Sequence, residues 1–355
     1  MTMQFKTFFS SFLAKSLLPI CAAGSLFLFS HNAQAEGRLT VYCSVQHSVC
    51  EKMAQVFAKK YNVDTKFVRN STGATLAKIK AEQALPQADI WYGGTIEPHF
   101  QAAQLGLLEP YRSPLQAETM PQFKALLDKH GDVTSIGYII VLGIGVNTEK
   151  FKQLGIKDYP KCWKDLTDPK FKDQIQMPDP RNTGTGYTFI ATLVQLFGEE
   201  EAFRYLKALD KNISQYAKSG TEKSNLSRGD AAITIGFING YQTEKENGAP
   251  VEAILPCEGD SYSLGGISIL KGARNLQNAK LFMDWALTPE AQEIAWREEK
   301  MYQIPTNIHA KASPNSTDPK TLKLIDFDFE RFGSDEEGKR LIKRWIEEIK
   351  LNATN

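Results

Sequence analysis

The chain has 355 residues, of which 42% are hydrophobic and 23% are charged, and its formal net charge is +1. This composition is ordinary for a globular protein, and the length is sufficient for two lobes of domain size. A nearly neutral chain without basic runs argues against nucleic-acid binding as its main function, because binding to phosphate backbones needs clustered cations.

The first 35 residues have the pattern of a secretory signal peptide. Two lysines supply its positive region, residues 17–29 supply an apolar core, and Ala33-Gln34-Ala35 supplies a cleavage site. Neither this apolar run nor any later one is long enough to span a membrane comfortably. We therefore expect a soluble, exported protein that starts near Glu36. Lipidation at Cys21 is the alternative, although Ile20 does not suit a lipoprotein box.

Four cysteines remain after the signal peptide: Cys43, Cys50, Cys162 and Cys257. An even number of cysteines in an exported protein indicates disulfides. Three pairings are possible, of which the local one joins Cys43 to Cys50 and leaves Cys162 with Cys257. A zinc site is the rival interpretation, but the cysteines lie far apart and lack C-x-x-C spacing.

The segment after the signal peptide alternates between predicted strands and helices. Strands are expected at residues 39–43, 63–68 and 89–91, and helices at residues 47–61 and 76–82. Such alternation predicts an open, mostly parallel α/β sheet. Ligands of these sheets bind at the carboxyl ends of the strands, so this edge is the expected site.

Two extended, apolar segments punctuated by glycine, residues 136–147 and 263–270, are predicted to cross between two lobes as hinge strands. The alternative is that both are ordinary core strands. A second alternation of strands and helices lies between them, and later helices return to the first lobe or brace it. This organisation divides the chain into a signal peptide (1–35), lobe 1 (36–135), lobe 2 (136–262) and a return to lobe 1 with C-terminal helices (263–355).

The run from Met177 to Leu193, MPDPRNTGTGYTFIATL, predicts a turn followed by a buried helix. A helix start presents unpaired N–H groups and a partial positive charge, and neighbouring hydroxyls complete a site for a phosphate or a carboxylate. Similar hydroxyl-rich openings occur at residues 69–75, 92–95 and 219–221. We predict that these four openings line one cleft that binds an anion.

Several stretches together resemble a known family. They are LTVYCSVQHSVCEKMAQVFAKKY, ADIWYGGT, KCWKDLTDPKFKDQIQMPDPRNTGTGYT and GGISILKGARNLQNAKLFMDWALTPEAQE. The chain is similar over nearly all of its mature length to periplasmic solute-binding proteins of the extracellular solute-binding family 1, in the ferric-binding-like branch and nearest to its hexose-phosphate-binding members. The resemblance implies a two-lobed α/β periplasmic-binding-protein fold. It also implies delivery of a ligand to an ABC permease.

Two departures from the family pattern bear on the ligand. Ferric members use two adjacent tyrosines, whereas this chain has Tyr241 followed by Gln242, and an amide is a poor ligand for Fe(III). Hexose-phosphate members carry His-Asp and Glu where this chain has Asn239, Gly240 and Ser263. The anion-binding stretches are kept, so the resemblance implies a changed partner for the rest of the ligand.

The expected ligand-binding residues combine the hydroxyl-rich openings with these family positions. They are Ser44, Ser71, Thr72, Gly73, Gly94, Thr95, Thr183, Gly184, Thr185, Ser219, Gly220, Asn239, Tyr241 and Ser263.

Two arginines and three histidines are further candidates for contacts at the cleft. Arg69 and Arg181 flank two openings and are either phosphate contacts or surface charges. His47 is either a donor at the cleft or part of a helix end. We expect His99 and His130 to face solvent.

We predict a monomeric periplasmic protein that captures a sugar phosphate, another phosphate ester, a phosphonate or phosphate for an ABC importer, without a cofactor or a resident metal. Ferric-iron binding is the alternative ligand. A further alternative is that the loaded protein reports to a membrane sensor kinase. An enzyme such as a phosphatase is disfavoured because no G-x-S-x-G elbow, metal-ligand motif or Ser-His-Asp arrangement is apparent.

Overall fold

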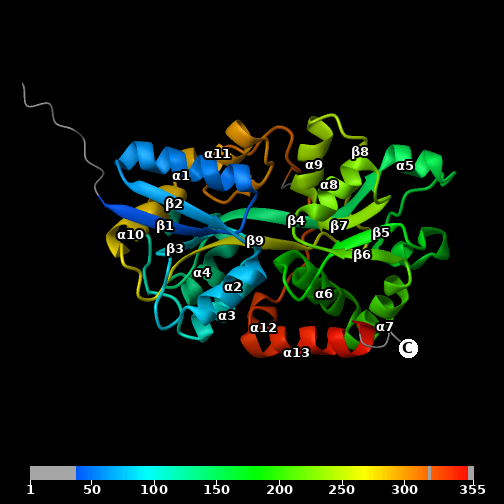
Figure 1. Ribbon diagram of the computed structural model, residues 1–355, viewed down its shortest axis with the longest axis horizontal. Coiled ribbons are helices and arrows are strands. Elements are labelled where there is room, and N and C mark those ends of the chain that lie inside the picture. The colour runs from blue at the N-terminus through cyan, green and yellow to red at the C-terminus, as the bar shows by residue number, and fades with distance from the viewer. Residues whose placement is uncertain (1–36, 319–320, 351–355) are drawn as a thin grey trace, which may run out of the picture. The chain divides into compact units, whose positions relative to one another are not determined.

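The computed structural model describes residues 37–318 and 321–350 (Figure 1). The predicted signal peptide therefore lies outside the described residues. Within them, none of the helices combines the length and apolar character that a bilayer crossing requires.

Ten strands of the described chain form one sheet, in the order β2-β1-β3-β9-β4-β7-β5-β6, with β10 and β8 also paired to β4. The strands are β1 (Arg38–Cys43), β2 (Asp64–Arg69), β3 (Ile90–Tyr92), β4 (Ser135–Asn147), β5 (Ile175–Pro178), β6 (Ile213–Ala217), β7 (Ile233–Phe237), β8 (Val251–Ile254), β9 (Tyr262–Ile269) and β10 (Ile304–Pro305). We call β2, β1, β3, β9 and β10 the first half of the sheet, and β7, β5, β6 and β8 the second half.

Helices cover both halves of the sheet (Figure 1). They are α1 (His47–Tyr61), α2 (Thr72–Ala81), α3 (Glu97–Gln104), α4 (Lys124–His130), α5 (Thr148–Gln153), α6 (Gly184–Phe197), α7 (Glu199–Asp210), α8 (Thr221–Arg228), α9 (Ile238–Glu246), α10 (Leu276–Ala286), α11 (Pro289–Glu299), α12 (Phe329–Phe332) and α13 (Asp335–Trp345). Helix α2 begins four residues earlier than the sequence predicted, so Thr72 and Gly73 lie in its first turn.

Strand β4 joins the two halves. It is buried along its whole length, pairs with β9 through Val141 and then pairs with β7 from Leu142 onward. Parallel pairing is confined to the outer strands on both sides, where β1 pairs with β2 and β3 and β5 pairs with β6 and β7. Strands β4 and β9 are antiparallel, because β4 carries the chain into the second half and β9 follows the segment that brings it back to the first half.

The C-terminal helix α13 lies beside helices of both halves, α3 on one side and α6 on the other (Figure 1). Asp335 at its start forms an ion pair with Lys80 of α2 at 3.0 Å. Arg340 and Arg344 pair with Glu199 of α7 at 2.6 and 2.7 Å. The end of the chain thus contacts both halves, whereas the sequence suggested only a return to the first.

The structure contains the disulfides Cys43–Cys50 and Cys162–Cys257, which confirms the predicted pairing of the two neighbouring cysteines. The first joins the end of β1 to α1. The second joins the segment before Trp163, a buried residue of the second half, to the loop after β8. Because all four sulfur atoms are used in disulfides, the zinc interpretation is wrong.

Candidate functional site

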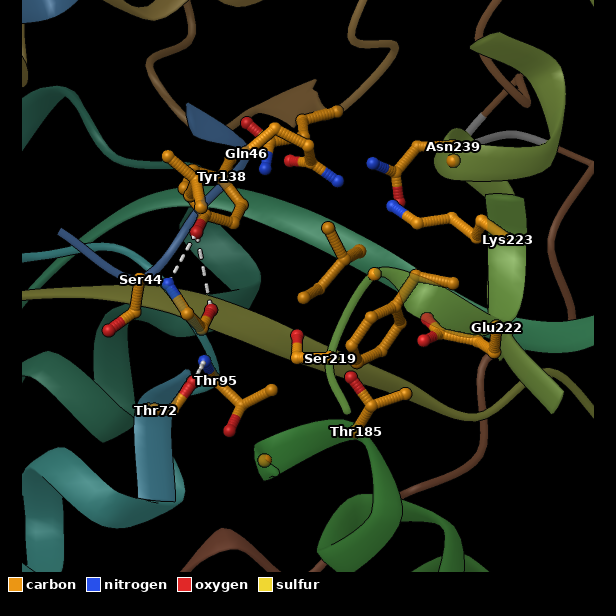
Figure 2. A pocket seen from close by; sticks show the side chains of 18 of the residues that line it. Ser44, Gln46, Thr72, Thr95, Tyr138, Thr185, Ser219, Glu222, Lys223 and Asn239 are labelled. Carbon is orange, nitrogen blue, oxygen red and sulfur yellow. Dashed lines mark hydrogen bonds between the residues drawn. The ribbon is translucent and has the colours of Figure 1, made fainter. Parts of the chain in front are cut away.

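A pocket of about 80 Å³ lies where β1 and β3 end and where α2, α6, α8 and α9 begin. Figure 2 shows side chains from these elements pointing into it. Nine of the fourteen predicted residues line this pocket: Ser44, Thr72, Gly94, Thr95, Gly184, Thr185, Ser219, Gly220 and Asn239. The predicted convergence of helix starts is therefore present, at the carboxyl ends of parallel strands.

Three helix starts around the pocket offer backbone N–H groups. Ser71, which precedes α2, makes no side-chain cap, so the first turn of this helix carries N–H groups without such a partner. Gly220, which precedes α8, has no side chain to cap with, and the Glu222 carboxylate instead faces the backbone N–H groups of Gly220 and Glu222. Helix α6 is capped by Thr183, whose hydroxyl accepts from the N–H of Gly186 at 3.1 Å. Helix α2 is also tied to the neighbouring loop, because Thr72 Oγ1 accepts from the N–H of Thr95 at 3.2 Å.

Three buried polar atoms of the pocket have no hydrogen-bond partner in the protein: Thr95 Oγ1, Glu222 Oε2 and Asn239 Oδ1. The residues that carry them are 2%, 4% and 6% exposed. A buried polar group without a partner costs about 1–3 kcal/mol, and native structures contain few of them. Their grouping in one pocket is typical of a site whose ligand supplies the missing partners.

The pocket contains two cations, Arg69 and Lys223, and one acid, Glu222. Burial lowers the pKa of Arg69 and of Lys223, whereas the nearby charge of Glu222 opposes both shifts. Burial also raises the pKa of Glu222, and the charge of Lys223 opposes this rise. With the acid ionised, the excess of one positive charge favours an anionic guest.

The two halves of the sheet contact each other directly beside the pocket. Ser71 Oγ donates to the backbone oxygen of Asn182 at 2.5 Å. At Gly184, the first residue of α6, an added Cβ would lie 2.2 Å from Thr95 Oγ1. The absence of a side chain at Gly184 therefore allows the start of α6 to approach Thr95. This close approach places the hydroxyl groups of Thr95 and Thr185 in one site.

Three predicted residues lie next to the pocket and support it without lining it. Ser71 forms the contact with Asn182 just described, and Thr183 is buried as the cap of α6. Gly73 packs closely against the backbone of Asn182, where an added Cβ would be 2.9 Å from the carbonyl oxygen. All three keep the two helix starts in place.

Tyr241 and Ser263 are placed away from the pocket, which corrects their predicted position. Tyr241 is fully buried in the core of the second half, and its hydroxyl accepts a hydrogen bond from Thr234 at 3.0 Å. Ser263 is fully buried in β9 and donates to the carboxylate of Glu97 at 2.9 Å. Their apolar surroundings and existing partners leave neither hydroxyl available to a ligand in the pocket.

Predictions for the remaining residues had mixed outcomes. His99 is fully buried, stacks on Trp91 with 3.7 Å between ring centroids and bonds to Ser268, so the expectation that it faces solvent was wrong. Arg69 reaches the pocket. Arg181 instead pairs with Asp179 at 2.6 Å, away from it.

Sequence reasoning missed five polar residues of the pocket: Gln46, Tyr138, Glu222, Lys223 and Gln303. Glu222 and Lys223 follow directly after the Ser219-Gly220 opening, so their place in the first turn of α8 was a usable signal. Tyr138 and Gln303 come from distant segments and carry no local motif. Tyr138 Oη accepts from the N–H of Gly94 at 2.7 Å (Figure 2) and so fixes the loop after β3.

Residues 86–331 match the family described as bacterial extracellular solute-binding protein, and the chain belongs to this family. It is 61% identical to the periplasmic binding protein P5PA, covering 88% of this chain and 100% of that one with a TM-score of 0.87. It is 54% identical to the periplasmic binding protein AfuA from Actinobacillus pleuropneumoniae with fructose 6-phosphate bound, covering 89% and 99% of the chains with a TM-score of 0.87.

More distant relatives extend the range of ligands. A putative 2-aminoethylphosphonate-binding periplasmic protein from Salmonella typhimurium is 23% identical over 81% of this chain and 86% of its own length. The major ferric iron-binding protein of Neisseria meningitidis is 25% identical over 78% of this chain and 83% of its own length. These comparisons confirm the predicted two-lobed periplasmic-binding-protein fold and a solute-binding role without catalysis.

Proposed function

We propose that the chain is the periplasmic substrate-binding component of an ABC importer and that it captures a small phosphorylated compound. The candidates are a sugar phosphate, another phosphate ester, a phosphonate and phosphate itself. The observation that carries the proposal is one pocket that combines three helix starts, two cations and a buried, unpartnered threonine hydroxyl. The inner-membrane permease, the monomeric state and the periplasmic location belong to the same proposal.

The mechanism is the replacement of water around the anion by preorganised donors. The starts of α2 and α8 and the side chain of Thr185 line the pocket, and we propose that their backbone N–H groups and the Thr185 hydroxyl donate to the anion. Arg69 adds a positive charge to the same lining, where its Nη2 lies 3.5 Å from Ser219 Oγ. Contact between the two halves then excludes solvent, which strengthens each of these bonds. We propose β4 as the element about which the halves open.

Thermal unfolding with a panel of ligands tests the proposal. The panel contains inorganic phosphate, fructose 6-phosphate, glycerol 3-phosphate and 2-aminoethylphosphonate. At about 100 times Kd a ligand adds about 2.7 kcal/mol to the free energy of unfolding, which raises the melting temperature by several degrees. A melting temperature that responds to Fe(III) and to none of the phosphates would overturn the proposal.

Ferric binding is the weaker candidate because its expected phenolate is unavailable. Tyr241 is buried and bonded to Thr234. In the described part of the chain, the group with possible metal ligands is Cys162, Cys257 and Glu258, and both of its sulfur atoms belong to a disulfide.

A further inference from the structure

The two ends of α13 are attached to the protein by different kinds of contact. At its last residue, the ring of Trp345 is fully buried and lies 5.1 Å from the ring of Tyr216 of β6. The guanidinium of Arg344 lies over the ring of Phe203 of α7, 4.2 Å from its centroid, and pairs with Glu199 at 2.7 Å. Apolar burial and ion pairs act together here, so we expect α13 to move with the second half.

The first turn of α13 contacts the first half through polar groups. The carboxylate of Asp335 pairs with Lys80 of α2 at 3.0 Å, and the backbone N–H of Asp335 donates to Gln104 Oε1 of α3 at 2.9 Å. Gly338 lies against the amide of Gln101 of α3, where an added Cβ would be 2.6 Å from Nε2. These contacts join the start of α13 to two helices of the first half.

A cavity of about 170 Å³ separates part of α13 from α2 and α3. Its walls include Leu76 of α2, Gln101 of α3, Tyr187 of α6 and Ile342 of α13. Protein interiors are normally close-packed, with few voids larger than a water molecule. The contact between α13 and the first half is therefore looser than the packing around Trp345, so its separation breaks less apolar contact.

Asp335 shares its carboxylate between two lysines. Lys339 lies one turn later in α13 and pairs with one oxygen, whereas Lys80 pairs with the other. Partial burial favours a higher pKa for Asp335, but hydrogen bonds from Lys339 and Lys80 hold this pKa below its ordinary value, so the carboxylate is ionised at neutral pH. The Lys339 pair stays within one helix, while the Lys80 pair exists only while α2 lies against α13.

The two halves are in contact in this structure, and α2 takes part in that contact at both ends. Ser71, which precedes α2, donates to the backbone oxygen of Asn182 at 2.5 Å, and Lys80 in its last turn reaches α13. Neither Lys80 nor Asp335 lines the ligand pocket. An effect of this ion pair on the ligand must therefore pass through the relative position of the halves.

We propose that the Lys80–Asp335 ion pair, together with Gln104, holds the first half against α13 and favours the closed arrangement of the halves. The pair thereby raises ligand affinity from outside the pocket, a consequence that rests on the proposed function. Both are positioning residues. Their side chains are 35% and 14% exposed, and ion pairs partly open to water shift an equilibrium by up to about fivefold. Loss of the pair should speed ligand release and leave association unchanged, because the ligand enters while the halves are apart.

Lys80→Met and Lys339→Met form a matched pair of variants, because each removes one positive charge beside Asp335 and only the first breaks a contact between the halves. Titration calorimetry and stopped-flow mixing of the mature protein with fructose 6-phosphate measure the Kd and the release rate. We expect Lys80→Met to raise both by about three- to fivefold, and Lys339→Met by less than about 1.5-fold. Lys80→Glu, which places two acids opposite each other, should raise both by at least tenfold.

Salt distinguishes an ionic contact from a change of shape. In about 1 M sodium chloride the Debye length is about 3 Å, so the Kd of Lys80→Met divided by that of Lys339→Met should fall towards one. Equal Kd values for the two variants at low salt, or a ratio that salt does not change, would overturn the proposal and leave the proposed function intact. Failure of the wild-type protein to bind any of the four probes named above would overturn both.

Discussion

The two disulfides fasten the two halves of the molecule in different ways. Cys43–Cys50 closes a loop with a sequence separation of 7, and three residues inside that loop, Ser44, Val45 and Gln46, line the pocket. Cys162–Cys257 spans a separation of 95 that contains most of the second half, and neither cysteine reaches the pocket. The first disulfide therefore shapes the site, whereas the second mainly restricts the unfolded chain.

The same contrast holds for the polar groups of the two pocket ends. In the first half, the hydroxyl of Ser44 is already bonded within the protein, because Ser44 Oγ lies 3.0 Å from Thr75 Oγ1 and accepts from Trp91 Nε1 at 3.0 Å, whereas Thr95 Oγ1 has no partner. In the second half, Glu222 and Asn239 carry unpartnered atoms. The end of the pocket in the first half thus has one hydroxyl fixed by the protein and one left for a ligand, whereas the end in the second half has two acceptor atoms without a partner.

Replacing each cysteine pair by serine gives the largest expected effect on this contrast. Loss of Cys162–Cys257 should lower the free energy of unfolding by about 4–5 kcal/mol, and loss of Cys43–Cys50 by about 2–3 kcal/mol, because loop entropy grows with loop length. Urea unfolding measures both. The ligand Kd should change more for the Cys43–Cys50 variant. A larger loss of affinity from the remote pair would contradict the comparison.

Replacing Arg69 by Met tests one of the two cations that line the pocket. Hydrogen bonds to charged groups contribute about 1.5–3 kcal/mol, so the Kd for a phosphorylated ligand should rise by about 10- to 100-fold. Arg181→Met is the matched control, because that arginine pairs with Asp179 outside the pocket. Titration calorimetry should show little change for the control. Equal losses for both variants would remove Arg69 from the site.

Replacing Glu97 by Gln tests a buried carboxylate that links the halves. Glu97 is fully buried and accepts hydrogen bonds from Thr188 of α6 at 3.0 Å and from Ser263 of β9 at 2.9 Å. Burial raises the pKa of Glu97 in the folded protein, while those hydrogen bonds oppose the rise. The folded state therefore keeps this proton to higher pH than the unfolded state, and stability from this group falls as pH rises through the raised pKa.

We accordingly expect the melting temperature of Glu97→Gln, relative to wild type, to increase as the pH rises above the ordinary pKa of a glutamate carboxyl. Each kcal/mol in this difference corresponds to roughly 2–4 °C. Comparing the variant with wild type at each pH removes the contribution of the other carboxylates. Melting curves that stay parallel across this range would contradict the assignment.

Local patterns predicted the elements and one end of the pocket well. The hydroxyl-rich openings mark helix starts, and helix starts after parallel strands lie at one edge of a sheet, so Thr72, Thr95 and Thr185 could be grouped from sequence alone. The cysteine pairing followed from the short separation of Cys43 and Cys50.

The residues that sequence reasoning misplaced depend on tertiary packing. Tyr241 and His99 have polar atoms and polar neighbours in the sequence, yet both are fully buried because Thr234 and Ser268 supply their partners from adjacent strands. Tyr138 and Gln303 enter the pocket from segments that share no pattern with it. No local period or motif encodes such contacts.

Helix α13 has a consequence for how the chain reaches its native state. Leu341, Trp345 and the following Ile349 belong to the same apolar cluster as Ile144 and Phe203 of the second half. The apolar interior around β4 is therefore complete only when the last turns of the described chain are packed against it. A truncation before Leu341 would remove three buried side chains from the apolar cluster that surrounds β4.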